Sequence, residues 1–326
     1  MAMVSRKSGM KLLFGLSLLA LLLFWVDWRA GARMLLAVNP WLLLVNGFLF
    51  LLALWVAALR WRVLLRPQGL NPPLGELVKV YWIGAFANNF LPSNIGGDLA
   101  RVGWVRHYRD TAAILASVVA ERTAGFFVLL ACAMSGVVAH PQLLPTGELY
   151  AAFWALALLA LVVLGGVLAG AEPLARRLAR SSGVGVGWRG KLVHGMTRLA
   201  EAALCYRHRH AALADACGFS LLYYLLGFAA QYTYARALHL PLTFWEVAAV
   251  TPLIYLISLL PVSFNALGIA ESACVFFYLQ VGLRGEQALA LAFLARFVQM
   301  VYSLGGGCFL LFDKSKPLPP DRFGGP

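Results

Sequence analysis

Charged residues are scarce in this chain, and acidic residues are scarcer than basic ones. Asp, Glu, Lys and Arg make up 13% of the 326 residues, whereas 61% are hydrophobic. Soluble domains carry about 25% charged residues, so this composition excludes an ordinary water-soluble protein. The mean hydropathy of +0.76 is typical of a chain dissolved in lipid. The composition therefore predicts an all-α polytopic membrane protein.

The chain also lacks the residue clusters that metal centres, disulfide frameworks and hydrolytic sites require. Its five cysteines are scattered, without CxxC spacing or neighbouring histidines. They are Cys132, Cys205, Cys217, Cys274 and Cys308. No P-loop, Asp-x-Asp pair or Ser-His-Asp set is present. We therefore expect no catalytic residues, no metal site and no cofactor, and we do not expect an enzyme.

The net charge of +13 has a different meaning here than in a soluble protein. In a soluble chain it would favour nucleic acid as a partner. Here the Lys and Arg residues cluster between apolar runs, where the anionic headgroups of the cytoplasmic leaflet attract them. Nucleic-acid binding is therefore not expected, and membrane lipids are the expected partners.

Six apolar segments are near the ~20 residues that a helix needs to cross a bilayer. The predicted spans cover residues of about 10–27, 40–59, 111–138, 149–170, 212–237 and 287–312. Four shorter apolar pieces lie between them, about 74–91 with 97–109 and about 244–260 with 267–283. We interpret each pair as a re-entrant helical hairpin, which enters and leaves the membrane by the same face.

The basic residues orient these spans. The groups that share one side are Arg60, Arg62 and Arg66, then Arg101, Arg106 and Arg109, the segment Arg176 to Arg209, and Lys314 with Lys316. The loops on the other side, Ala139 to Glu148 and His239 to Thr243, contain no Lys or Arg, although Arg29, Arg33 and Arg284 are exceptions. The positive-inside rule then predicts an inner-membrane protein with both termini in the cytoplasm.

Two stretches of the chain resemble each other. In each, an apolar run is broken by Leu-Pro, polar residues and glycine, and an acid, Asp98 or Glu271, restarts the helix. A long apolar helix with one arginine follows, Arg122 in the first case and Arg296 in the second. The assigned sides make the two hairpins face in opposite directions, which predicts an inverted-topology repeat of about 74–138 and about 244–312. Paired interrupted helices of this kind mark transporter substrate sites.

The remaining segments complete one predicted transmembrane domain, residues 1–312. The segment of about 171–210 is basic with an apolar stripe at helical spacing, and we expect it on the cytoplasmic membrane surface. A connecting loop that obeys the positive-inside rule is the simpler alternative. The tail 313–326 is short, and we expect it to be cytoplasmic.

The two arginines are the leading candidates for substrate binding. An arginine near the middle of a span costs at least about 2.5–3.5 kcal/mol on insertion scales, so each needs a partner. Adjacent helical residues point about 100° apart, so Glu121 is not expected to neutralise Arg122. The candidate partners are Asp98 and Glu271, or a lipid phosphate, which a guanidinium binds through its bidentate fork.

A purely structural role remains open for all four residues. Arg122 and Arg296 would then lock the hairpins to the bundle by salt bridges and contact no substrate. Asp98 and Glu271 lie in the first turn of a restarting helix, where an acid caps free N–H groups. Together with Glu121, these two acids are also candidates for proton coupling.

The hairpin tips carry the other candidates. The predicted tip residues are Pro92, Gly96, Gly97, Pro261 and Gly268. Polar residues at membrane depth must find hydrogen bonds, and a lipid headgroup could supply them. The residues concerned are Asn88, Asn89, Asn94, Ser263 and Asn265.

These motifs resemble the membrane region of lysylphosphatidylglycerol synthase, which also occurs alone in flippase-like proteins. The resemblance covers about 10–312 and lies in Asn89-Phe90-Leu91-Pro92, Gly96-Gly97-Asp98, Arg101, Glu121-Arg122, and Pro261 to Gly268 followed by Glu271. The family pattern in the second hairpin is Asn-Gly-Leu-Gly, and Ala266 replaces its first glycine, so a slightly different tip is expected.

The resemblance implies translocation of an anionic, phosphate-headgroup lipid between leaflets, of the phosphatidylglycerol or polyprenyl-phosphate type. The tail after Phe312 cannot hold a transferase fold, so lysyl transfer is not expected from this chain alone. Two alternatives stay open: a membrane scaffold for a separately encoded lipid-modifying synthase, and an integral-membrane enzyme that acts on a lipid. The headgroup, the energy source and the oligomeric state do not follow from the sequence.

Overall fold

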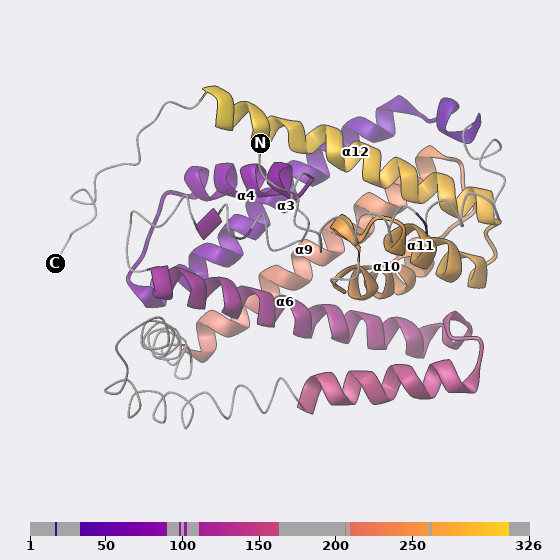
Figure 1. Ribbon diagram of the computed structural model, residues 1–326, viewed down its shortest axis with the longest axis horizontal. Coiled ribbons are helices and arrows are strands. Elements are labelled where there is room, and N and C mark those ends of the chain that lie inside the picture. Colours follow the sequence, from indigo (N-terminus) through magenta and orange to yellow (C-terminus); the bar gives the residue numbers. More distant parts are fainter. Residues whose placement is uncertain are drawn as a thin grey trace.

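A computed structural model describes residues 17, 33–89, 98, 101–102, 111–162, 206, 209–260 and 263–312. These residues form helices joined by short links (Figure 1). Four helices are long and apolar enough to cross a membrane. They are α3 (Pro40–Leu65), α6 (Thr111–Ala139), α9 (His210–Ala237) and α12 (Gly285–Phe312). At 1.5 Å per residue each is about 39–43 Å long, which exceeds the hydrocarbon core of about 30 Å.

Four of the six predicted spans are therefore confirmed as helices. Within the predicted span of about 149–170, the described part belongs to a helix, Gly147–Val162. The predicted span of about 10–27 lies outside the described residues except for Ser17, as do most of the segment 171–210 and the tail 313–326.

Besides Gly147–Val162, the described residues form three shorter helices between the long ones. They are α4 (Leu74–Asn88), α10 (Phe244–Ser258) and α11 (Ile269–Gln280). With 12 to 15 residues they reach about 18–22 Å, too short to cross the hydrocarbon core. A capping box fixes the beginning of α10, since Thr243 and Glu246 satisfy each other's backbone N–H groups. Single 3₁₀ turns occupy η1 (Arg66–Gln68), η2 (Pro141–Leu143) and η3 (Phe264–Ala266).

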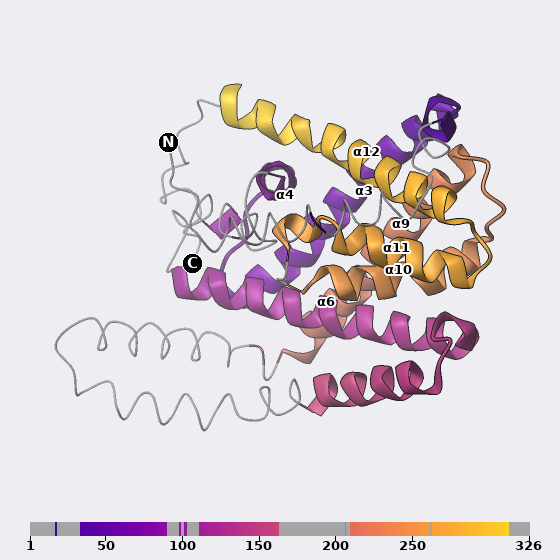
Figure 2. The same ribbon diagram turned by 45° about the vertical axis from the view of Figure 1, so that its right-hand side comes forward.

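Helices α3 and α9 form an antiparallel pair at the centre of the molecule (Figures 1 and 2). At one end the Asn39 N–H donates to the Ala237 carbonyl at 3.2 Å. At the other end the Tyr206 hydroxyl, just before α9, donates to the Leu64 carbonyl at 2.5 Å. Because α4 follows α3 and α10 follows α9 after short links, these two short helices begin at opposite ends of the pair.

Helices α4 and α10 each pack across the central pair, against the long helix of the other half. Helix α4 packs against α12, and α10 packs against α6. Glycines allow both approaches. A Cβ on Gly136 of α6 would meet the Ala249 carbonyl oxygen of α10 at 2.7 Å, and one on Gly306 of α12 would meet the Trp82 carbonyl oxygen of α4 at 2.1 Å. The Trp82 indole N–H then donates to the Tyr302 carbonyl of α12 at 2.8 Å.

The largest buried cluster gathers the links at one end of the molecule. Leu143, Leu240 and Leu283 follow α6, α9 and α11, and all three belong to this cluster. These links therefore lie together, at the end where α3 begins. In contrast, large apolar side chains such as Leu44, Phe48 and Leu158 are 63–66% exposed on the outer helix faces. Such apolar outer faces are typical of a protein surrounded by lipid.

The close approach of α4 and α12 predicts a strong effect at Gly306. The substitution Gly306→Ala forces its Cβ into the Trp82 backbone, which cannot move like a side-chain tip. Overpacking of this kind costs about 1–3 kcal/mol, so we expect a lower melting temperature for the detergent-purified protein. The matched control is Gly218→Ala in α9, where a Cβ meets nothing within 4 Å and helix propensity should raise the melting temperature. Equal melting temperatures for the two variants would contradict the packing.

Candidate functional site

Arg122 and Asp98 form a bidentate ion pair between α6 and the first hairpin. The Arg122 Nε donates to Asp98 Oδ2 at 2.8 Å, and Nη2 donates to Oδ1 at 2.7 Å. The Arg122 side chain is nevertheless 51% exposed, and among the described residues its Nη1 has no hydrogen-bond partner. Asp98 is one of the two acids predicted as partners. In the described part of the chain, one edge of the guanidinium is thus unpaired.

Arg296 is held differently in the second half. Its Nε donates to Glu271 of α11, and Nη1 and Nη2 point at the carbonyls of Asn265 and Ala266, at 3.3 and 3.5 Å. The side chain is 29% exposed, less than that of Arg122. The second hairpin therefore surrounds this guanidinium with acceptors.

Glu271 also caps its own helix. One carboxylate oxygen pairs with Arg296, and the other accepts the Gly268 N–H at 2.7 Å. Glu271 thus performs both roles that the sequence left open for it. Asp98 pairs with Arg101 of its own hairpin as well as with Arg122.

The tip of the second hairpin has an unusual backbone. Asn265 and Ala266 adopt positive φ angles of 47° and 53°, a region that non-glycine residues rarely occupy. Ala266 stands where the family pattern has glycine, so the left-handed turn is kept at some steric cost. Gly268 has φ 79° directly before α11, as a tip glycine should. Ser263 is buried, and its hydroxyl has no hydrogen-bond partner in the described part of the chain.

Glu121 lies at the centre of a charge cluster that sequence reasoning did not find. Its carboxylate is 2% exposed and accepts hydrogen bonds from Arg60 of α3, Tyr81 of α4 at 2.5 Å and Arg101 at 3.2 Å. Adjacent Arg122 is not among these partners, as the helical geometry predicted. One carboxylate therefore connects α3, α4, α6 and the first hairpin.

Aromatic rings and hydroxyls complete this cluster. The Arg101 guanidinium lies over the rings of Tyr81 and Trp61, at 4.2 and 5.1 Å. The Arg60 guanidinium lies over the Tyr223 ring at 5.1 Å and donates to the Ser220 hydroxyl at 3.4 Å. Cation–π contacts of this kind stabilise a desolvated guanidinium.

The two halves differ in charge. Among the described residues, three arginines, Arg60, Arg101 and Arg122, face two carboxylates, Asp98 and Glu121, which gives these five side chains one net positive charge. In the second half Arg296 and Glu271 balance each other. The two stretches with similar sequence motifs therefore carry electrostatically different sites.

Sequence reasoning missed Arg60 because it grouped this residue with Arg62 and Arg66 as positive-inside charges. In the structure α3 continues to Leu65, and Arg60 shares a buried face with Ala57 and Leu64. The signal was present as helical spacing, since these residues are three and four positions from Arg60.

The polar residues predicted at the hairpin tips differ in their locations and hydrogen-bond partners. The Asn89 side chain donates to the Ser303 hydroxyl of α12 at 2.6 Å, a helix-to-helix bond that leaves less for a substrate. Asn88 is half-buried at the end of α4. The predicted site and tip residues Pro92, Asn94, Gly96, Gly97 and Pro261 lie outside the described residues. In the described part of the chain, no group of three or more His, Cys, Asp or Glu side chains could hold a metal.

The fold and this buried charge cluster define a multi-pass helical membrane protein. The chain belongs to the family of the lysylphosphatidylglycerol synthase TM region, whose model matches residues 12–306. The resemblance seen in the motifs is thereby confirmed, and with it a membrane-lipid-related role. Comparisons with curated proteins and with solved structures gave no match.

The position of Glu121 predicts a large loss of stability when it is neutralised. Glu121→Gln leaves Arg60 and Arg101 buried without their shared carboxylate, and breaking a buried pair costs about 3–5 kcal/mol. We expect a clearly lower melting temperature in detergent. The control is Glu148→Gln, which neutralises an exposed acid. The double variant Arg60→Met with Glu121→Gln should recover part of the loss, because one unpaired charge is removed. A double variant no more stable than Glu121→Gln would count against the pairing.

Proposed function

We propose that this protein is a lipid flippase or scramblase-like transporter and not an enzyme, and that it moves an anionic phosphate-headgroup lipid between leaflets. The observation that carries the proposal is the surplus positive charge of the cluster described above, in which Arg60, Arg101 and Arg122 meet Asp98 and Glu121. Arg122 lies 11 residues into α6, about 17 Å from its beginning, and is therefore at membrane depth. A net charge at that depth is costly unless an anion meets it.

The proposed membrane topology of the protein is an inverted repeat with about six spans and two re-entrant hairpins. Its support is that α4 and α10 are too short to span and begin at opposite ends of the α3–α9 pair. The distribution of the basic residues supports an inner-membrane location with both termini cytoplasmic.

Within this proposal the two arginines have different roles. Arg122 is half-exposed and keeps an unpaired edge, so it is the phosphate ligand. Arg296 is occupied by Glu271 and by two tip carbonyls, so it mainly holds the second hairpin. This division assigns the substrate role to one arginine and the locking role to the other.

The roles are separable by translocation and stability measurements. The purified protein is placed in liposomes with fluorescent phosphatidylglycerol, and a membrane-impermeant quencher reports how much label reaches the outer leaflet. We expect Arg122→Gln to translocate at least about tenfold more slowly, while Arg122→Lys keeps part of the rate because the charge remains. Arg296→Gln should lower the melting temperature more than Arg122→Gln.

The control is Arg209→Gln, which removes an exposed arginine before α9. Fluorescent phosphatidylcholine, whose headgroup is neutral overall, tests the charge requirement. Quenching that stops at the outer-leaflet half in the wild type would contradict phosphatidylglycerol translocation. A folded Arg122→Gln protein that translocates at the wild-type rate would contradict the assignment of Arg122. If quenching of the wild type also stops at the outer-leaflet half, the scaffold alternative is favoured.

A further inference from the structure

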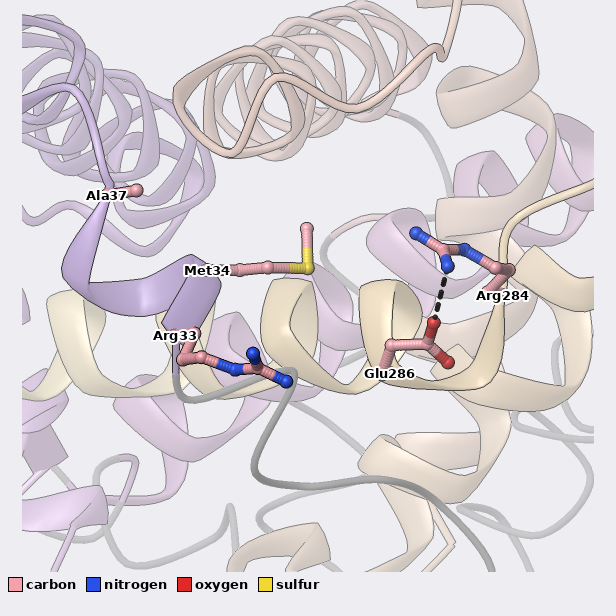
Figure 3. Close-up of a pocket in the computed structure, with 5 residues that line it drawn as sticks. All are labelled: Arg33, Met34, Ala37, Arg284 and Glu286. Carbon is pink, nitrogen blue, oxygen red and sulfur yellow. Dashed lines mark ion pairs between the residues drawn. The ribbon is translucent and has the colours of Figure 1, made fainter.

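A second group of arginines lies at the opposite end of the molecule. Arg33, before α3, and Arg284, directly before α12, line one pocket together with Met34, Ala37 and Glu286. Figure 3 shows the Arg33 and Met34 side chains reaching toward Arg284 and Glu286. The pocket holds about 350 Å³, near the lower end of the roughly 300–1,000 Å³ of small-molecule sites.

The charges of this pocket favour an anion. Arg284 pairs with Glu286 at 3.2 Å, yet its side chain remains 73% exposed. No residue of the described part of the chain pairs with Arg33, which is exposed. Two guanidinium groups and one carboxylate leave one net positive charge, and a guanidinium pair is well suited to phosphate.

The position of the pocket indicates a lipid as the source of that anion. Leu36, 89% exposed, and Trp41, 74% exposed, follow Arg33 closely in the sequence, and Trp41 is in the first turn of α3. Exposed tryptophan next to an apolar span is typical of the level of the lipid headgroups. Arg33 and Arg284 are also two of the few basic residues that the sequence places on the outer side.

The depth of the pocket sets it apart from the Arg122 cluster. Helix α3 begins at Pro40, near the pocket, and reaches Arg60 of the cluster 20 residues later. At 1.5 Å per residue the two are about 30 Å apart along the helix, the thickness of the hydrocarbon core. The pocket thus lies near one membrane surface, and the cluster lies within the opposite half of the membrane.

We propose that the pocket lined by Arg33 and Arg284 binds the phosphate of an anionic phospholipid headgroup in the leaflet opposite the Arg60–Glu121 cluster. Glu286 weakens this binding by neutralising Arg284. The site is separate from Arg122, and its occupation requires no translocation.

Native mass spectrometry of the detergent-purified protein tests this binding. All measurements use an Arg122→Gln background, so the result does not depend on the transport site proposed above. The protein is titrated with phosphatidylglycerol and, separately, with phosphatidylcholine. We expect preferential binding of phosphatidylglycerol, weakened about two- to fivefold by Arg33→Ala and by Arg284→Ala.

Two further variants sharpen the test. Glu286→Gln should strengthen phosphatidylglycerol binding, because it frees Arg284 and raises the net charge of the pocket. Arg236→Ala is the matched control, since it removes an exposed arginine at the same end, in the last turn of α9, outside the pocket. It should leave binding unchanged.

The opposite results would overturn the proposal. Equal binding of phosphatidylglycerol and phosphatidylcholine would do so, as would phosphatidylglycerol binding that Arg33→Ala and Arg284→Ala leave unchanged. So would a loss of phosphatidylglycerol binding in Arg236→Ala as large as in the pocket variants, or unchanged or weaker binding in Glu286→Gln. Glycerol phosphate distinguishes a lipid from a soluble anion. Competition by this soluble compound at concentrations equal to those of the lipid would overturn the lipid as occupant.

Discussion

The structure depends on the burial of one carboxylate, Glu121, among guanidinium groups. In lipid, a lone charge is so costly that charged residues occur almost only with partners, and each partner must be brought to the right depth. Glu121 therefore fixes the positions of Arg60 on α3, Tyr81 on α4 and Arg101 in the first hairpin. Helices that would otherwise slide along apolar surfaces acquire a defined register, because a shift of one turn would separate the charges by about 5.4 Å.

Both halves must provide partners for arginine at membrane depth, but they use different chemical groups to do so. In the second half, the tip backbone bends into a strained left-handed turn, and its Asn265 and Ala266 carbonyls serve as acceptors for Arg296. Glu271 then balances the charge. In the first half, side chains from several helices serve as partners, and the arginines outnumber the acids. Similar sequence motifs therefore give a neutral ion pair around Arg296 in the second half and a more exposed site with net positive charge around Arg122 in the first.

Much of this arrangement could be predicted from the sequence. Length and hydropathy located the long helices. The cost of unpaired charge at membrane depth gave Asp98, Glu271 or a lipid phosphate as candidate partners of the two arginines, and the structure pairs Arg122 with Asp98 and Arg296 with Glu271. Arg60 could not be found in this way, because a charge near a helix end satisfies the positive-inside rule whether it is solvated or buried. Only the packing of α3 against α6 and α9 distinguishes the two cases.

The charge surplus also has a consequence for movement through the membrane. A site with one net positive charge is stable where water or anionic headgroups reach it, and costly where they do not. In the proposed function, a phosphate diester with one negative charge that binds at Arg122 would make the cluster with its ligand neutral. The electrostatic cost of enclosing the site then falls, so the loaded state can close more readily than the empty one. Since α4 packs on α12 and α10 on α6, closure around the first hairpin would also move the helices of the second half. In the proposed function, the charge of the substrate would in this way couple the two halves of the protein.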